Sequence, residues 1–184
     1  MEPETLSRIV EAIVLTSPGP VRADAVHEAL AEDGVSASAV EEALASLQAE
    51  WEEADRALRL ERVASGWRAV TVAQLDPYLR AFHGVTARQR LSQAALEVLS
   101  IVAHREPVTL PEVNFIRGAN SASVVRTLLD RKLLRVAGRK RVVGKPFLYR
   151  TTKDFLIHFG LESVNDLPDP EELLRQIDLE IAPS

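Results

Sequence analysis

The sequence predicts a mostly α-helical chain with small β-hairpins, an α+β fold of two tandem winged-helix domains and a C-terminal helical tail. Two observations support this fold class. Apolar residues repeat at helical spacing in several segments, and each set of helical segments precedes two segments in which apolar and polar residues alternate. The order helix, helix, helix, strand, strand then occurs a second time. That order is the winged variant of the helix-turn-helix.

The first expected domain begins with three helices. Apolar residues recur at helical spacing near the start, and the sequence SPGP at 17–20 ends the first helix. A second short helix is expected at about 22–31, before Gly34. Ser38 and Glu41 have the spacing of a capping box, which would open the third helix. The apolar stripe of this third helix consists of Val40, Leu44, Leu47 and Trp51.

A β-hairpin should follow the third helix. The segments ALRLERV and WRAVTV alternate with a period of two and are separated by residues 64–66. We expect Trp67 to be exposed and to serve self-association of this domain, together with a long stripe of Ala and Leu. A further helix at 74–82 would carry Pro77 in its first turn.

The same order of elements recurs from Leu91. A helix should end near Pro107, and Thr109 and Glu112 have the spacing of a second capping box. The strands LLRVA and PFLYRTT flank a glycine-bounded loop at 138–144. The inward-facing residues expected in this half are Ala95, Leu99, Val102, Val124, Val125, Leu128 and Leu129. Thr152 should cap a helix that Gly160 ends, followed by one turn at 163–167.

Short identities between the halves support two copies of one unit. Pro20-Val21 corresponds to Pro107-Val108 at an offset of 87 residues, and similar matches occur at 85 and 86. A last helix should begin at Asp169-Pro170-Glu171 and end in a frayed tail. We therefore assign an N-terminal winged-helix domain to 1–80, a linker to 81–90, a C-terminal winged-helix domain to 91–168 and a helical tail to 169–184.

Charge is strongly segregated along the chain. Residues 1–80 hold 7 basic and 15 acidic side chains, residues 81–153 hold 14 and 4, and residues 154–184 hold 1 and 8. The formal net charge of −5 hides this division. The basic middle contains the stretch AGRKRVVGKPFLYRTT at 137–152, which a negatively charged partner could recognise.

Composition argues against an enzyme, a cofactor site or a metal site. The chain has no Cys, and its four His are isolated from one another, without metal-ligand spacing. A phosphate-binding loop is excluded because five residues separate Gly138 from Gly144-Lys145 and because Pro146 follows. We expect no catalytic residue. The first twenty residues fit neither a signal peptide nor a membrane span, so we expect a cytoplasmic protein with no membrane partner.

Three interpretations of the basic middle remain open at this point. It could bind DNA as a transcriptional regulator does, it could bind an acidic protein segment, or it could be a solvated surface. The candidate DNA contacts are Arg126, Arg131, Lys140 and Arg141. The acidic third helix of the first domain argues against a regulator that reads paired half-sites with both domains.

The second half also resembles a known family. Its most telling pieces are LSQAALEVL, the EPVT step, Ile116-Arg117-Gly118, Ser121, Gly138-Arg139, Gly144-Lys145-Pro146 with Tyr149, and Phe155-Leu156 with Phe159-Gly160-Leu161. In combination over residues 91–168 they resemble the segregation and condensation protein B (ScpB) family. His104 departs from the family pattern, in which an aromatic Tyr is expected, and Lys145 stands where Arg is commoner.

The resemblance implies a non-enzymatic subunit that acts in chromosome condensation and segregation during cell division. It implies a nucleoid-associated homodimer, joined through its N-terminal domains, whose C-terminal domains bind the kleisin ScpA. ScpA in turn bridges the heads of the SMC ATPase, so that DNA is contacted indirectly or weakly. The candidate kleisin contacts are Arg117, Asn120, Arg139, Lys145 and Tyr149.

Overall fold

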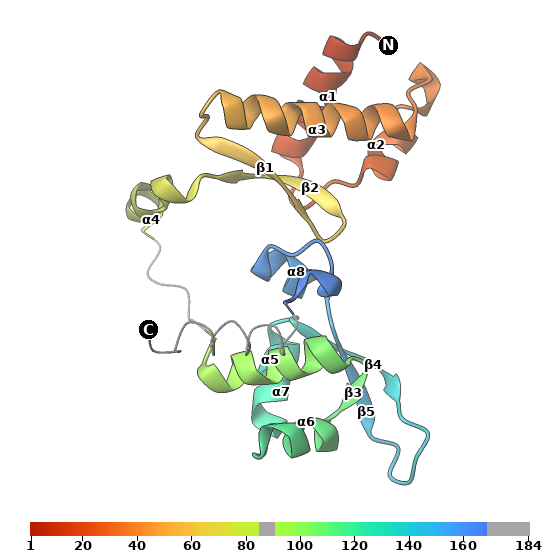
Figure 1. Ribbon diagram of the computed structural model, residues 1–184, viewed down its shortest axis with the longest axis vertical. Helices are drawn as coiled ribbons and strands as arrows, with labels where there is room; N and C mark the ends of the chain where they lie inside the picture. Colours follow the sequence, from red (N-terminus) through yellow and green to blue (C-terminus); the bar gives the residue numbers. More distant parts are fainter. Residues whose placement is uncertain (85–90, 169–184) are drawn as a thin grey trace, which may run out of the picture. The chain divides into compact units, whose positions relative to one another are not determined.

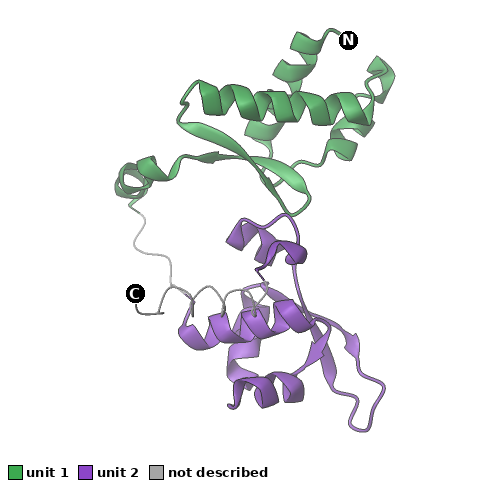
Figure 2. Ribbon diagram, in the orientation of Figure 1, with its two compact units in different colours: residues 1–90 green, residues 91–184 purple. Residues whose placement is uncertain are grey.

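The computed structural model describes residues 1–84 and 91–168. These residues form a mixed α/β structure with small antiparallel sheets. The chain divides into two compact units, Met1–Arg90 and Leu91–Ser184 (Figure 2). The expected tail helix from Asp169 and most of the expected linker lie outside the described residues.

Unit 1 consists of a helical layer and a two-stranded sheet (Figure 1). Its elements are α1 (Pro3–Thr16), α2 (Ala23–Ala29), the 3-10 helix η1 (Ala31–Asp33), α3 (Ala37–Glu53), β1 (Leu58–Val63), β2 (Gly66–Thr71), η2 (Ala73–Leu75) and α4 (Asp76–His83). The order of helices and strands is the predicted one. The further helix α4 spans the boundary at 80/81 that the sequence suggested.

The capping box predicted at the start of α3 is wrong. Ser36 is the N-cap, and its hydroxyl accepts a hydrogen bond from the amide of Ala39 at 3.2 Å. Glu41 is instead oriented toward the hairpin, where its Oε2 accepts a hydrogen bond from the indole Nε1 of Trp67 at 3.1 Å. The spacing favoured Ser38 because Glu41 lies three residues after it. In the structure Glu41 bonds to Trp67 instead, so the capping box of Ser38 and Glu41 does not form.

The expectation of an exposed Trp67 is also wrong. Its side chain is buried in the core of unit 1, and the guanidinium of Arg62 lies 5.1 Å from the centroid of its ring. Its backbone amide and carbonyl bond to Val21 at 2.7 and 2.8 Å, which places Val21 beside β2 as an isolated bridge. Trp67 therefore holds the hairpin against the helices, and it is not available for self-association.

The β1–β2 hairpin closes through a two-residue turn. Val63 pairs with Gly66, and Ala64 and Ser65 between them have φ values of 50° and 58°. Two positive φ values are the signature of a type I′ turn, whose twist matches that of the flanking strands. The structure thus confirms the predicted hairpin, and Gly66 is the first residue of β2.

Unit 2 repeats the arrangement with one more strand. Its elements are α5 (Gln93–Arg105), β3 (Val108–Thr109), α6 (Leu110–Arg117), α7 (Ala122–Asp130), β4 (Leu134–Arg139), β5 (Phe147–Thr151), α8 (Lys153–Phe159) and η3 (Val164–Asp166). The strand order is β3-β5-β4, all antiparallel. The strand β3 was not predicted from the sequence. It corresponds to the Val21 bridge of unit 1, because both begin at the valine of the repeated Pro-Val pair.

The caps predicted in unit 2 are confirmed. Thr109 and Glu112 form the capping box of α6. The hydroxyl of Thr152 accepts a hydrogen bond from the amide of Phe155 at 3.1 Å, and Gly160 ends α8 with φ 69°. Only glycine adopts such a left-handed conformation without steric cost, so this helix ends where the sequence predicts.

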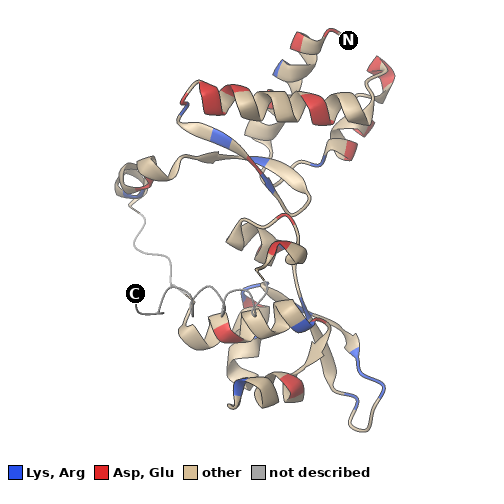
Figure 3. Cartoon of the chain, viewed as in Figure 1, with Lys and Arg blue, Asp and Glu red and all other residues tan. Residues whose placement is uncertain are grey.

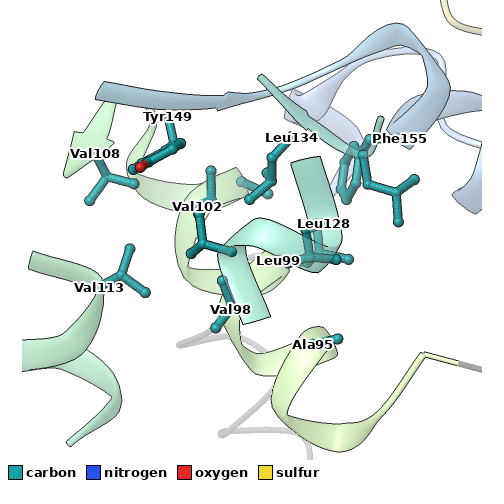
Figure 4. Packing of buried hydrophobic residues seen from close by; sticks show 13 residues of the cluster. Ala95, Val98, Leu99, Val102, Val108, Val113, Leu128, Leu134, Tyr149 and Phe155 are labelled. Carbon is teal, nitrogen blue, oxygen red and sulfur yellow. The ribbon is translucent and has the colours of Figure 1, made fainter. Parts of the chain in front are cut away.

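Each unit has its own hydrophobic core. In unit 1 the predicted stripe of α3 is fully buried against α1, α2 and the hairpin. In unit 2 the side chains of Val102, Leu128 and Leu134 lie close together between α5, α7 and β4 (Figure 4). Tyr149 and Phe155 belong to the same cluster. Two separate cores make each unit capable of its own cooperative unfolding.

Candidate partner-binding site

The hairpin of β4 and β5 extends beyond the core of unit 2 as a well-bonded wing. Within it, the guanidinium of Arg139 lies 3.9 Å from the centroid of the Phe147 ring and donates a hydrogen bond to the carbonyl of Lys145 at 3.0 Å. The amide of Lys145 donates to the carbonyl of Val142 at 2.9 Å. The tip of the wing is apolar, since Val143 is fully exposed. Arg139 therefore holds the base of the loop in shape, while the side chain of Lys145 stays exposed.

Lys140 is tied to the start of α6. Its ammonium pairs with Oε1 of Glu112, and Oε2 of the same carboxylate accepts from the amide and the hydroxyl of Thr109 at 2.8 and 2.7 Å. The hydrogen bonds from Lys140 and then Thr109 lower the pKa of Glu112 to about 2, from its ordinary value of 4.5. This contact joins the wing to the helix that follows β3.

We expect the Glu112 contact to make unit 2 sensitive to acid. Because the folded pKa lies below the unfolded one, its contribution to stability is present above pH 4.5 and is lost as the pH falls toward 2. Replacing Glu112→Gln should therefore make the thermal midpoint of unit 2 less dependent on pH between 5 and 2. Midpoints from circular dichroism at several pH values check this, with Asp130→Asn, at an exposed carboxylate of the same unit, as the control. Identical pH profiles for E112Q and the parent would contradict the assignment.

Two of the five candidate kleisin contacts are largely internal. Arg117 donates from Nε to Glu97 at 2.9 Å and from Nη1 to Ser121 at 3.4 Å, and its side chain is only 17% exposed. Tyr149 is buried in the core. Both side chains connect elements of unit 2, Arg117 across α5, α6 and the start of α7.

The other candidates lie at the surface. Asn120 is exposed, although its Oδ1 accepts from the amide of Ala122 at 3.0 Å. Arg126 lies on the exposed side of α7, and Arg131 follows that helix. Arg141 is exposed on the wing. The nine candidates are thus spread over three places, the end of α6, α7 and the wing.

The structure shows a partly apolar surface along α5 and α6 that was not predicted from the sequence. Two crevices of 650 and 630 Å³ lie on it and share Ile116. The first is lined by Arg105, Pro107, Val108, Pro111, Glu112, Phe115 and Ile116, and the second by Gln93, Leu96, Glu97, Ser100, Ile101, Ile116 and Arg117. Phe115 is 87% and Ile116 is 50% exposed. We call this surface the α5–α6 groove.

The signal for this groove was present in the sequence. Phe115 and Ile116 are adjacent in the sequence, and neighbouring residues of a helix point in different directions, so both cannot face one core. In the structure α6 buries only Val113. A smaller crevice of 410 Å³ has the corresponding place in unit 1, lined by Pro20, Val21 and residues of α1 and α2. Exposed large apolar side chains gathered around a hollow mark a site for another molecule.

The described residues form no cluster of metal ligands. Among residues 1–84 and 91–168, no group of three or more His, Asp and Glu side chains could hold a metal ion. None of the helices described there is long and apolar enough to cross a membrane. The features that do stand out, the groove and the wing, are surfaces suited to binding macromolecules.

The chain is similar to known proteins over most of its length. Residues 8–170 match the family "Segregation and condensation complex subunit ScpB". The chain is 40% identical over 172 residues to segregation and condensation protein B of Syntrophotalea carbinolica, covering 94% of this chain and 85% of the relative. It is 41% identical over 140 residues to that of Halalkalibacterium halodurans, covering 76% and 71%. The crystal structure of ScpB from Mycobacterium tuberculosis covers 88% of this chain and 98% of its own, with 34% identity and a TM-score of 0.42. The chain therefore belongs to the ScpB family of segregation and condensation complex subunits.

Proposed function

We propose that the chain is a non-enzymatic, homodimeric subunit of an SMC–ScpA–ScpB complex that acts in chromosome condensation and segregation. In this proposal both units are winged-helix domains, unit 1 joins two copies, and unit 2 binds the kleisin ScpA. The SMC ATPase is then reached through ScpA. Membership of the family supports the role in segregation and condensation.

The α5–α6 groove is the observation that best supports the proposed binding of the kleisin. It offers exposed apolar anchors in Leu96, Phe115 and Ile116, and hollows between them that could take a partner's apolar side chains. Arg105 lies at one end and Asn120 follows α6 at the other. A kleisin segment with apolar anchors and acidic flanks is complementary to this surface. The contacts proposed for it are Leu96, Phe115, Ile116 and Asn120, with Arg117 shaping the groove.

The element order supports the winged-helix assignment of both units. In each, the valine of the repeated Pro-Val pair lies beside the hairpin, as Val21 does in unit 1 and Val108 in unit 2. The third helix, α3 or α7, is followed directly by that hairpin. In the proposal the two domains differ in use, since residues 1–80 are acidic and residues 91–153 are basic (Figure 3).

Self-association is proposed for unit 1 through a surface other than Trp67. The helix α4 carries Tyr78 and Phe82 on one side, four residues apart and 73% and 84% exposed. Large apolar side chains so exposed favour association over solvation. Sedimentation equilibrium of the full chain tests this, with a Tyr78→Ser, Phe82→Ser double variant expected to be monomeric.

Co-purification with the cognate kleisin tests the main proposal. We expect Phe115→Ser and Ile116→Ser to weaken the complex at least tenfold, since interface anchors lose about 2 kcal/mol or more on truncation. Both side chains are exposed, so the thermal midpoint should change little. Val143→Ser at the tip of the wing is the matched control, because it removes an even more exposed apolar side chain elsewhere in unit 2. Equal affinities for F115S and the parent would overturn the groove assignment.

A further inference from the structure

The strand register of the wing places two arginines directly opposite each other. Arg135 on β4 pairs with Arg150 on β5, in an antiparallel ladder whose neighbouring pair is Leu134 with Thr151. Leu134 and Thr151 are buried, while Arg135 and Arg150 are both exposed. Because successive side chains of a strand point to opposite faces, the two guanidinium groups share the outer face of the sheet.

This pair has no counter-ion among the described residues. The segment 131–153 holds nine Lys and Arg and no Asp or Glu, and Figure 3 shows the blue of Lys and Arg around the loop of the wing, with no red there. The nearest carboxylates along the connected strands are already engaged. Glu106 accepts from the amide and hydroxyl of Thr151 at 2.6 and 2.7 Å, and Glu112 pairs with Lys140. Like charges directly opposite on a sheet are destabilising, so the pair costs stability in the free protein.

We propose that Arg135 and Arg150 form a clamp for backbone phosphates of duplex DNA. Each guanidinium presents planar, paired N–H donors that match the oxygens of one phosphate, and an anion between the two relieves their repulsion. The contact is independent of base sequence, since phosphates carry no sequence information. It goes beyond the proposed kleisin role, because neither arginine lines the α5–α6 groove.

The surroundings of the clamp favour DNA over an acidic protein segment. A protein partner needs apolar anchors beside its charges, and in unit 2 the hollows lined by such anchors lie along α5 and α6. The outer face of the sheet offers Gly138 and half-buried Leu148 next to the pair, and exposed Arg141 farther along the wing. The exposed apolar side chains of the wing, Val136, Val142, Val143 and Phe147, line neither of these hollows. A run of cations away from such hollows suits a phosphate backbone.

The helix α7 gives no comparable surface for reading bases. Its nine residues carry a single cation, Arg126, and one acid, Asp130. Sequence-specific readout through a third helix needs several side chains that reach base edges. In this proposal Arg135 and Arg150 contact DNA in place of Arg126 and Lys140, which were candidates from the sequence. We expect the binding to be weak and salt-sensitive.

Fluorescence anisotropy with two unrelated duplexes of equal length tests the clamp in the full-length protein. Arg135→Gln and Arg150→Gln should each weaken binding several-fold to both duplexes and make the slope of log affinity against log salt shallower by about 1. Arg126→Gln is the matched control, an exposed arginine of the same unit, and should leave the affinity within about twofold.

A second readout separates the clamp from a merely structural role. Because each substitution removes a like-charge neighbour, R135Q and R150Q should raise the thermal midpoint of unit 2 in chloride. Inorganic phosphate should raise the midpoint of the parent more than that of either variant. Unchanged DNA affinity in R135Q and R150Q would overturn the proposal, as would equal losses in R126Q. A change of affinity for the kleisin alone would assign the pair to the protein partner instead, and would also overturn it.

Discussion

Leu128→Ala is expected to lower the free energy of unfolding of unit 2 by about 2–5 kcal/mol. The Leu128 side chain is completely buried between α5 and β4, so its removal leaves a cavity that the surrounding side chains cannot fill (Figure 4). Both tryptophans of the chain, Trp51 and Trp67, lie in the core of unit 1. Tryptophan fluorescence therefore reports on unit 1, while far-ultraviolet circular dichroism reports on both units.

In L128A we expect the circular dichroism transition to gain an earlier component, while the fluorescence transition keeps its midpoint. Leu44→Ala is the matched control, because Leu44 is equally buried in the core of unit 1. It should shift the fluorescence midpoint instead. If L128A shifted the fluorescence midpoint as much as L44A, the two cores would not unfold independently.

Gly66→Ala is the second large effect that we expect, a loss of about 1–3 kcal/mol of unit 1 stability. A Cβ at this position would lie 3.0 Å from the carbonyl oxygen of Val21 and 3.1 Å from Cβ of Pro20. These atoms belong to the segment that bridges to Trp67, so the added methyl would push the Val21 strand away from β2. The hydrogen bonds between Val21 and Trp67 would then lengthen.

Chemical denaturation followed by tryptophan fluorescence measures this effect. Gly19→Ala is the control, since nothing lies within 4 Å of a Cβ built there and the residue directly precedes Pro20, which Gly66 approaches. G19A should change the free energy of unfolding by less than about 0.5 kcal/mol. Equal midpoints for G66A and G19A would show that the Val21 bridge is not held closely against β2.

Local rules predicted the helices and their ends where the deciding partner lies within a few residues. The stripe of α3, the capping box of Thr109 and Glu112, and the stop at Gly160 all depend on neighbours one turn away. The turn at Ala64 and Ser65 was located by the alternation of the flanking strands. These features are properties of short segments, and the structure confirms them.

Candidate functional residues were harder to judge because their environment depends on distant partners. Trp67 is buried because Val21 and Glu41 approach it from other elements. Tyr149 and Arg117 carried the family resemblance, yet both hold unit 2 together. A conspicuous residue type indicates that a position matters, while only its neighbours decide whether it faces a core or a partner.

Four features could be predicted from the sequence alone: the fold class of helices and hairpins, their order in two repeated halves, the segregation of charge and the family resemblance. Each rests on periodicity or composition, which the chain carries before it folds. Only the tertiary structure joined Phe115 and Ile116 to Leu96 in one groove, paired Lys140 with Glu112, and set Arg135 opposite Arg150. The physical reason is that a groove, an ion pair and a strand register are formed between segments that are distant in the chain. Packing, and the β-bulge of the wing at Ala137, decide which side chains meet.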